Sequence, residues 1–161
     1  MARVRADQEL IPSVLDRLRT VRKDGSVTPA GRRGTRLDDL KEAVRDDLKD
    51  LLNTKQFAGA IPPGLRHLPD SLLTFGLPDL THASLASADD RSALKRAVED
   101  AIRRFEPRLT HVVVALLEGR EFDRGLRFRI DAALVVEPEP LPVTFNSVLD
   151  LATKSFEVKS D

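Results

Sequence analysis

The chain has 161 residues with 26 basic and 26 acidic side chains, so its formal net charge is zero. This length suits one domain with a real core, and the zero net charge argues against a whole-molecule field for nucleic acid or anionic lipid. Cysteine is absent, which excludes disulfides, thiolate metal sites and cysteine nucleophiles and fits a reducing cytoplasm. The N-terminus has no apolar signal core, and no run approaches the ~18 apolar residues of a membrane span, so we expect no direct membrane insertion.

Two segments precede the expected body of the protein. Residues 1–21 are predicted to form an N-terminal helical arm, because apolar residues recur at helical spacing and Pro12 suits a first helical turn. Residues 22–36 are rich in glycine, proline and basic residues, which predicts a flexible basic linker. This linker is either a solvated connection or a contact for an acidic partner surface. The apolar residues of the arm are Leu10, Ile11, Val14, Leu15, Leu18 and Val21.

Residues 37–161 are predicted to form a single α+β domain that begins with helices. Apolar residues at helical spacing predict one helix from about Leu37, with Thr35 as its cap, to Asn53. A second long helix is predicted to start after Ser87 and to stop before Pro107. Between them we expect a loop, one or two helical turns at 70–75 and an extended run at 77–80.

The C-terminal half carries strand patterns. Residues 112–117 are apolar on both faces, which predicts a central strand covered on both sides, and residues 126–136 alternate as its antiparallel partner. Short strands are expected at 143–145 and 155–158, whereas residues 147–151 fit a helix or a strand equally well. The expected architecture is N-terminal helices packed on one face of a small, mainly antiparallel sheet.

No constellation of catalytic or metal-binding residues stands out. The three histidines, His67, His82 and His111, are scattered and lack metal-ligand spacing. Paired acids are present, but they fall on predicted helix starts or charged faces, and the chain has no Trp or Tyr platform for a sugar. We therefore expect no enzyme, no cofactor and no metal, with a peptidoglycan-cleaving, lysozyme-like glycoside hydrolase as the alternative.

The most informative stretch is Glu106-Pro107-Arg108, set between a helix and an apolar strand. Pro107 must stop the helix, and in an extended stretch Glu106 and Arg108 lie two residues apart and point to the same side. The pair could engage a partner as one bipolar unit, since Arg108 can grip a carboxylate and Glu106 can accept N–H donors. The simpler interpretation is a helix stop with two surface charges.

Several segments in this order resemble the TssE family of type VI secretion baseplate subunits. That family is related to the wedge and sheath-initiator protein of contractile phage baseplates and was historically called lysozyme-related. The segments are Leu10-Ile-Pro-Ser-Val-Leu-Asp-Arg-Leu18, Leu51-Leu-Asn-Thr54, Phe75-Gly-Leu-Pro-Asp-Leu80, Phe105-Glu-Pro-Arg-Leu109, Leu126-Arg-Phe-Arg-Ile130 and Phe145-Asn-Ser-Val-Leu-Asp-Leu151. The linker at 22–36 carries no pattern of that family.

The resemblance implies a non-catalytic, cytoplasmic structural subunit, in a baseplate docked at the inner membrane complex. It would bind larger wedge subunits, similar to TssF and TssG, through Glu106, Pro107 and Arg108. It would also help the first ring of sheath proteins to dock, by offering a sheet edge near residues 143–145 and 155–158. Nucleic-acid binding through Arg22–Arg36 is disfavoured by the zero net charge and the lack of stacking aromatics.

Overall fold

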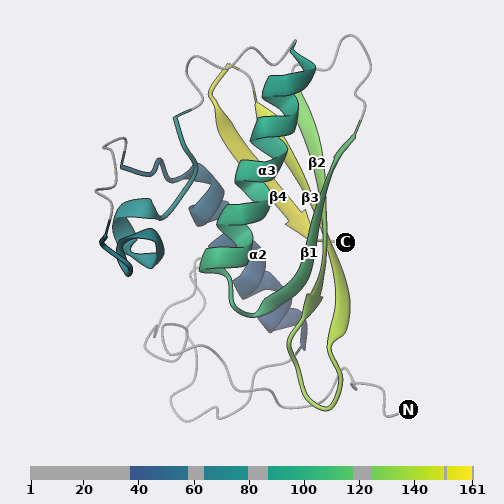
Figure 1. Cartoon of the computed structure of the whole chain (residues 1–161). Helices are drawn as coiled ribbons and strands as arrows, with labels where there is room; N and C mark the ends of the chain where they lie inside the picture. The colour runs from purple at the N-terminus through teal and green to yellow at the C-terminus, as the bar shows by residue number, and fades with distance from the viewer. Residues whose placement is uncertain (1–36, 58–63, 80–86, 118–124, 151, 161) are drawn as a thin grey trace, which may run out of the picture.

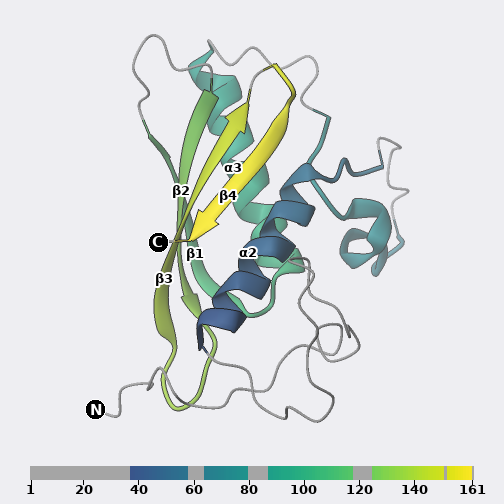
Figure 2. The same cartoon turned by 180° about the vertical axis from the view of Figure 1, so that it is seen from behind.

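The computed structural model describes residues 37–57, 64–79, 87–117, 125–150 and 152–160. The predicted arm and linker, Thr35, Leu80, His82 and most of the turn after the first strand lie outside these residues. In the described part, two helices pack on one face of a four-stranded sheet (Figures 1 and 2). The predicted α+β fold class is therefore confirmed.

Helices α2 (Leu37–Asn53) and α3 (Ala88–Phe105) match the two predicted helices closely. The Ser87 hydroxyl accepts a hydrogen bond from the backbone N–H of Asp90, as expected of an N-cap residue. Each helix buries one apolar stripe, and α2 lies against β4 while α3 lies against β1. The buried residues are Leu37, Leu40, Val44, Leu48, Leu51 and Leu52 in α2, and Leu94, Val98, Ala101 and Ile102 in α3.

The sheet is an antiparallel meander in the order β1-β2-β3-β4. Its strands are β1 (Leu109–Leu117), β2 (Gly125–Leu134), β3 (Leu141–Asp150) and β4 (Ser155–Ser160). Alternate residues of each strand face the helices and complete the core, as in the pair of Phe128 and Phe156, whose ring centroids are 5.9 Å apart. The opposite face carries polar residues such as Arg129 and Asp131.

Two strand predictions were wrong in detail. The strand at 112–117 is an edge strand rather than a central one, and Val113 is 52% exposed on the face without helices. Its continuous apolar run misled the prediction, because Val113 needs no cover to be stable in a strand. The separate short strand at 143–145 is part of the ten-residue strand β3, which also includes residues 147–150 of the segment that fitted a helix or a strand.

The segment between the helices contains two 3₁₀ turns, η1 (Leu68–Asp70) and η2 (Leu72–Thr74), close to the predicted turns at 70–75. It is anchored at its C-terminal end, where Phe75 packs edge-on against Phe105 of α3 with centroids 5.2 Å apart. Gly76 follows in a positive-φ conformation, and the buried Leu77 forms a parallel bridge with Lys55. The predicted loop at 55–69 thus ends in helical turns.

A stability prediction follows from Ser147, a hydroxyl in the middle of the core. Its side chain faces the helices at 1% exposure, and its Oγ has no hydrogen-bond partner in the described structure. Because an unpaired buried hydroxyl is costly, we expect Ser147→Ala to raise the free energy of unfolding by about 1 kcal/mol. Urea unfolding checks this, with Ser155→Ala at an exposed site as the control; a loss of stability in Ser147→Ala would show that the hydroxyl is paired after all.

Candidate partner-binding site at the Glu-Pro-Arg corner

The corner forms where α3 meets β1. The N–H of Glu106 still donates to the carbonyl of Ile102, at 2.9 Å, so Glu106 closes the last turn of the helix. Pro107 cannot continue the helix, and the N–H of Leu109 then donates back to the Glu106 carbonyl at 3.1 Å. The chain leaves this tight turn as β1, and the carbonyl of Arg108 accepts from the N–H of Val135 beyond β2. The expected proline stop is confirmed.

Arg108 is the centre of an ionic cluster that joins three elements. Its Nε donates to Oε1 of Glu106 at 2.6 Å, and its Nη2 donates both to Oε2 of Glu106 and to Oδ2 of Asp47, each at 2.5 Å. Burial lowers the pKa of the Arg108 guanidinium, but hydrogen bonds and charges from Glu106 and Asp47 outweigh it and raise the pKa above its usual value. Arg108 is therefore a permanent cation that ties α2 to the start of β1.

This geometry corrects one expectation about the corner. Glu106 and Arg108 do point to the same side, but the Glu106 carboxylate is 5% exposed and is engaged by Arg108 itself. The pair is therefore not an open bipolar unit. Pro107 is exposed and the Arg108 side chain retains 23% exposure, so these two residues form the outer surface of the corner.

The sequence analysis missed Asp47 as part of this site. It lies 61 residues before Arg108 and is 39% exposed on the side of α2 next to the corner. A helix with six acidic residues gives no local signal for which one reaches a distant arginine. Only the packing of α2 beside the end of α3 selects Asp47.

The other candidate residues do not converge. His67 precedes η1, and His111 lies in β1 at a bulge with a φ of 53°. Among the described residues, no group of three or more His, Cys, Asp or Glu side chains could hold a metal ion. The described acid with the deepest burial, Glu106, is paired with Arg108 and so differs from the isolated carboxylic acid of a glycosidase.

Comparison with known proteins identifies the chain. The family model described as baseplate wedge protein gp25 matches residues 38–139, which is more than half of the sequence and includes both helices and the Glu-Pro-Arg corner. The chain belongs to the gp25 family of baseplate wedge proteins. Membership in this family confirms the resemblance to baseplate wedge subunits that the sequence indicated, and it makes this wedge protein a structural component of a baseplate.

Two further comparisons describe this gp25-family chain. It is similar to a chain in a solved structure, "The baseplate complex from the type VI secretion system", with 23% identity and a TM-score of 0.47. The similarity covers 76% of the wedge protein and 94% of that chain. No curated protein matches it. No helix in the described part of the wedge protein combines the length and apolar character needed to cross a membrane.

Proposed function

We propose that this chain is a non-catalytic wedge subunit of a type VI secretion baseplate, which binds larger wedge subunits and helps to start the contractile sheath. Membership in the gp25 wedge family is the observation that carries the proposal. The larger subunits would resemble TssF and TssG, and the subunit would act in a cytoplasmic baseplate. Two structural features support particular contacts: the Glu-Pro-Arg corner and the margin of the sheet at β4.

At the corner, the partner would meet Pro107 and the exposed edge of Arg108. Glu106 would act from inside as the counter-ion that holds the guanidinium in place, rather than as a direct contact. Because the hydrogen bonds to Glu106 and Asp47 fix Arg108 before binding, little side-chain entropy is lost when a partner docks. A preorganised arginine at a rigid turn suits a permanent assembly contact.

Strand β4 is the edge strand on the far side of the sheet from β1, and a strand added to the sheet would pair with its outer edge. The Asn53 side chain bonds both the N–H and the C=O of Phe156, at 2.8 Å and 2.9 Å, so these backbone groups point away from β3. Val158, two residues on, turns its backbone groups the same way. At Phe156 these groups are already satisfied by Asn53. No strand of the described chain lies beyond β4, so a strand from a sheath protein would pair by β-augmentation at Val158 and past it.

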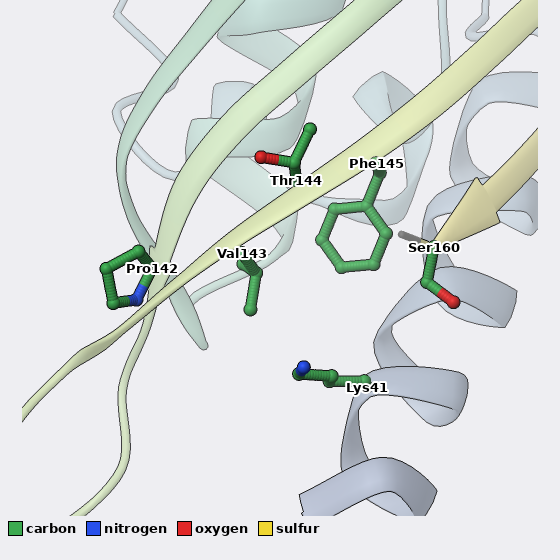
Figure 3. A pocket seen from close by; sticks show the side chains of 6 residues that line it. All are labelled: Lys41, Pro142, Val143, Thr144, Phe145 and Ser160. Carbon is green, nitrogen blue, oxygen red and sulfur yellow. The ribbon is translucent and has the colours of Figure 1, made fainter. Parts of the chain in front are cut away.

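Strand β3 also runs on past the end of β4. The last pair is Phe145 with Ser160, and beyond it lies an open hollow of about 230 Å³ beside Pro142 and Thr144. Figure 3 shows Lys41 of α2 facing this hollow from the helix side. A strand added here would continue the line of β4, and an acidic side chain on it would complement Lys41.

The test is the affinity of purified subunit for the larger wedge subunits. Because removing Arg108 alone leaves the buried Glu106 uncompensated, we use the double variant Glu106→Gln/Arg108→Gln, which removes both charges and keeps a polar side chain at each position. Loss of a desolvated charged contact costs about 2 kcal/mol or more, so Kd should rise about 30-fold or more. Isothermal titration measures Kd, after circular dichroism has shown that the variant is folded.

Arg129→Gln is the matched control. Arg129 pairs with Asp131 on the sheet face without helices, so its loss removes an ionic contact far from the corner. We expect its Kd to stay within a factor of about two of the unchanged protein. Unchanged affinity in the double variant, or an equal loss in Arg129→Gln, would contradict the role proposed for the corner.

A further inference from the structure

Strand β1 is the second edge strand of the sheet, on the opposite side from β4 (Figures 1 and 2). No strand of the described residues pairs with its outer side. Residues 112–117 read Val-Val-Val-Ala-Leu-Leu, without a charged residue, a proline or a glycine. Edge strands usually carry charges or proline that discourage pairing with another chain, as β4 does with Glu157 and Lys159. The outer edge of β1 therefore has the character of a pairing surface.

The register of the sheet shows which backbone groups of β1 point outward. Asn53 binds the N–H and the C=O of Phe156, so these groups point away from β3. Because residues that bond to a given neighbour alternate along an antiparallel strand, this orientation fixes the outward residues of the other strands. In β1 they are Val114 and Leu116, whereas Ala115 bonds to β2. The strand pairs that connect β4 to β1 in this way are Glu157–Val148, Ser147–Phe128 and Arg129–Ala115.

A side chain of α3 supports this assignment independently. Nη2 of Arg103 donates to the carbonyl of Val112 at 2.9 Å, so Val112, two residues before Val114, also points away from β2. Glu99 accepts a hydrogen bond from the same Nη2 at 2.5 Å and holds it there. The carbonyl of Val112 is therefore occupied. In the described part of the chain, Val114 and Leu116 are the residues of this edge that can pair with an added strand.

These two residues fit the same two residues of a second copy. When two β1 strands run antiparallel with Ala115 facing Ala115, Val114 of each copy lies opposite Leu116 of the other. The two outward N–H and two outward C=O groups of each strand are then all paired. Ala115 lies in the non-hydrogen-bonded pair, where strands approach most closely, and its small side chain suits that position.

The side chains favour this register and this partner. On the sheet face without helices, Val113 of one copy lies opposite Leu117 of the other, so every facing pair is apolar and no charge is desolvated. A two-fold centre at Val114 would instead require Val112, whose carbonyl is already bound by Arg103. The zero net charge of the chain adds no long-range repulsion between copies.

We propose that the free subunit forms a two-fold dimer by antiparallel pairing of β1 with β1 of a second copy, centred on Ala115. The two-fold axis is perpendicular to the sheet, so the helices of both copies lie on the same face of one continuous sheet. Strand β4 lies at each outer end, where it stays accessible to an added strand. The interface is small, so we expect a reversible dimer with a Kd on the order of 10⁻⁵ M.

Sedimentation velocity of the full chain, at concentrations below and above the expected Kd, tests the proposal with charge variants. Ala115→Lys and Ala115→Glu each place two like charges opposite one another, so each variant alone should raise Kd about tenfold or more. An equal mixture of the two should recover the dimer, because opposite charges then face each other. Val148→Lys is the matched control, since Val148 is 37% exposed on the same sheet face but lies in the inner strand β3, and its Kd should be unchanged.

A cysteine variant keeps the test independent of any effect of charge on folding. The chain has no natural cysteine, so Ala115→Cys introduces one thiol per copy. In a non-hydrogen-bonded pair the two Cα atoms lie about 4.5 Å apart, which is within the range for a disulfide. We expect air oxidation to link Ala115→Cys into a covalent dimer several-fold faster than Val148→Cys.

Each outcome decides the matter. Dimerisation of the unchanged chain, its loss in the single charge variants and its recovery in the mixture support the proposal. A monomer at every concentration overturns it, and a mixture that stays monomeric overturns the register centred on Ala115. Association that persists in Ala115→Lys, or a disulfide that forms no faster at residue 115 than at residue 148, shows that copies meet elsewhere. Affinity for the larger wedge subunits is measured separately, so failure of the dimer leaves the proposed function standing.

Discussion

Glu106→Ala is expected to lower the free energy of unfolding by about 3–5 kcal/mol. The Glu106 carboxylate accepts three hydrogen bonds from Arg108, two from the guanidinium and one from the backbone N–H at 3.2 Å. Its removal leaves a largely buried guanidinium with Asp47 as its remaining carboxylate, and an unbalanced buried charge is among the most destabilising changes a protein can suffer. Urea unfolding followed by circular dichroism measures the loss.

Glu139→Ala is the control for this change, since Glu139 is exposed and its loss should cost no more than about 0.5 kcal/mol. The double variant Glu106→Leu/Arg108→Met distinguishes the effect of losing the whole ion pair from the effect of leaving Arg108 without Glu106. It replaces both charges by apolar groups, so it should be more stable than Glu106→Ala. If Glu106→Ala unfolds at the urea concentration of the unchanged protein, the carboxylate is not the internal counter-ion that the geometry indicates.

Gly76→Ala is expected to be nearly as severe, at about 3 kcal/mol. Gly76 has a φ of 104°, which a residue with a Cβ adopts only under strain. A Cβ built there would lie 2.2 Å from the carbonyl oxygen of Thr54, and that oxygen accepts the N–H of Leu77 at 2.8 Å. The clash is with backbone, so relief requires Leu77 to leave the core or the end of α2 to move. Thermal unfolding should show a fall in Tm of roughly 6–12 °C.

Gly64→Ala makes a matched control within the same segment. Gly64 has a nearly identical φ of 103°, but a Cβ there would meet no atom within 4 Å. It should therefore show the conformational cost alone, about 1–2 kcal/mol. The difference between the stability losses of the two variants measures the cost of the steric clash with Thr54 at position 76. Equal losses would show that this clash adds no cost.

The helices and the fold class could be predicted because they depend on local signals. The spacing of the leucines in α2 predicts its buried stripe. Ser87 marks the start of α3 because its hydroxyl caps the helix, and Pro107 marks its end because proline cannot continue a helix. Strands were predicted less well, since a strand is defined by its neighbours. The apolar run of β1 looked like a covered strand, but its place at the edge of the sheet is set by the order of pairing.

The sequence by itself determined the order of the elements, with helices before strands. It also determined the position of the corner, where Pro107 ends a helix between two residues of opposite charge. Only the tertiary structure decided what those charges do. Glu106 and Arg108 are near each other in any extended turn, but the packing of α2 brings Asp47 to the same guanidinium and places the carboxylate of Glu106 out of water. Local patterns encode backbone geometry, whereas burial and the pairing of charges depend on contacts between residues far apart in the chain.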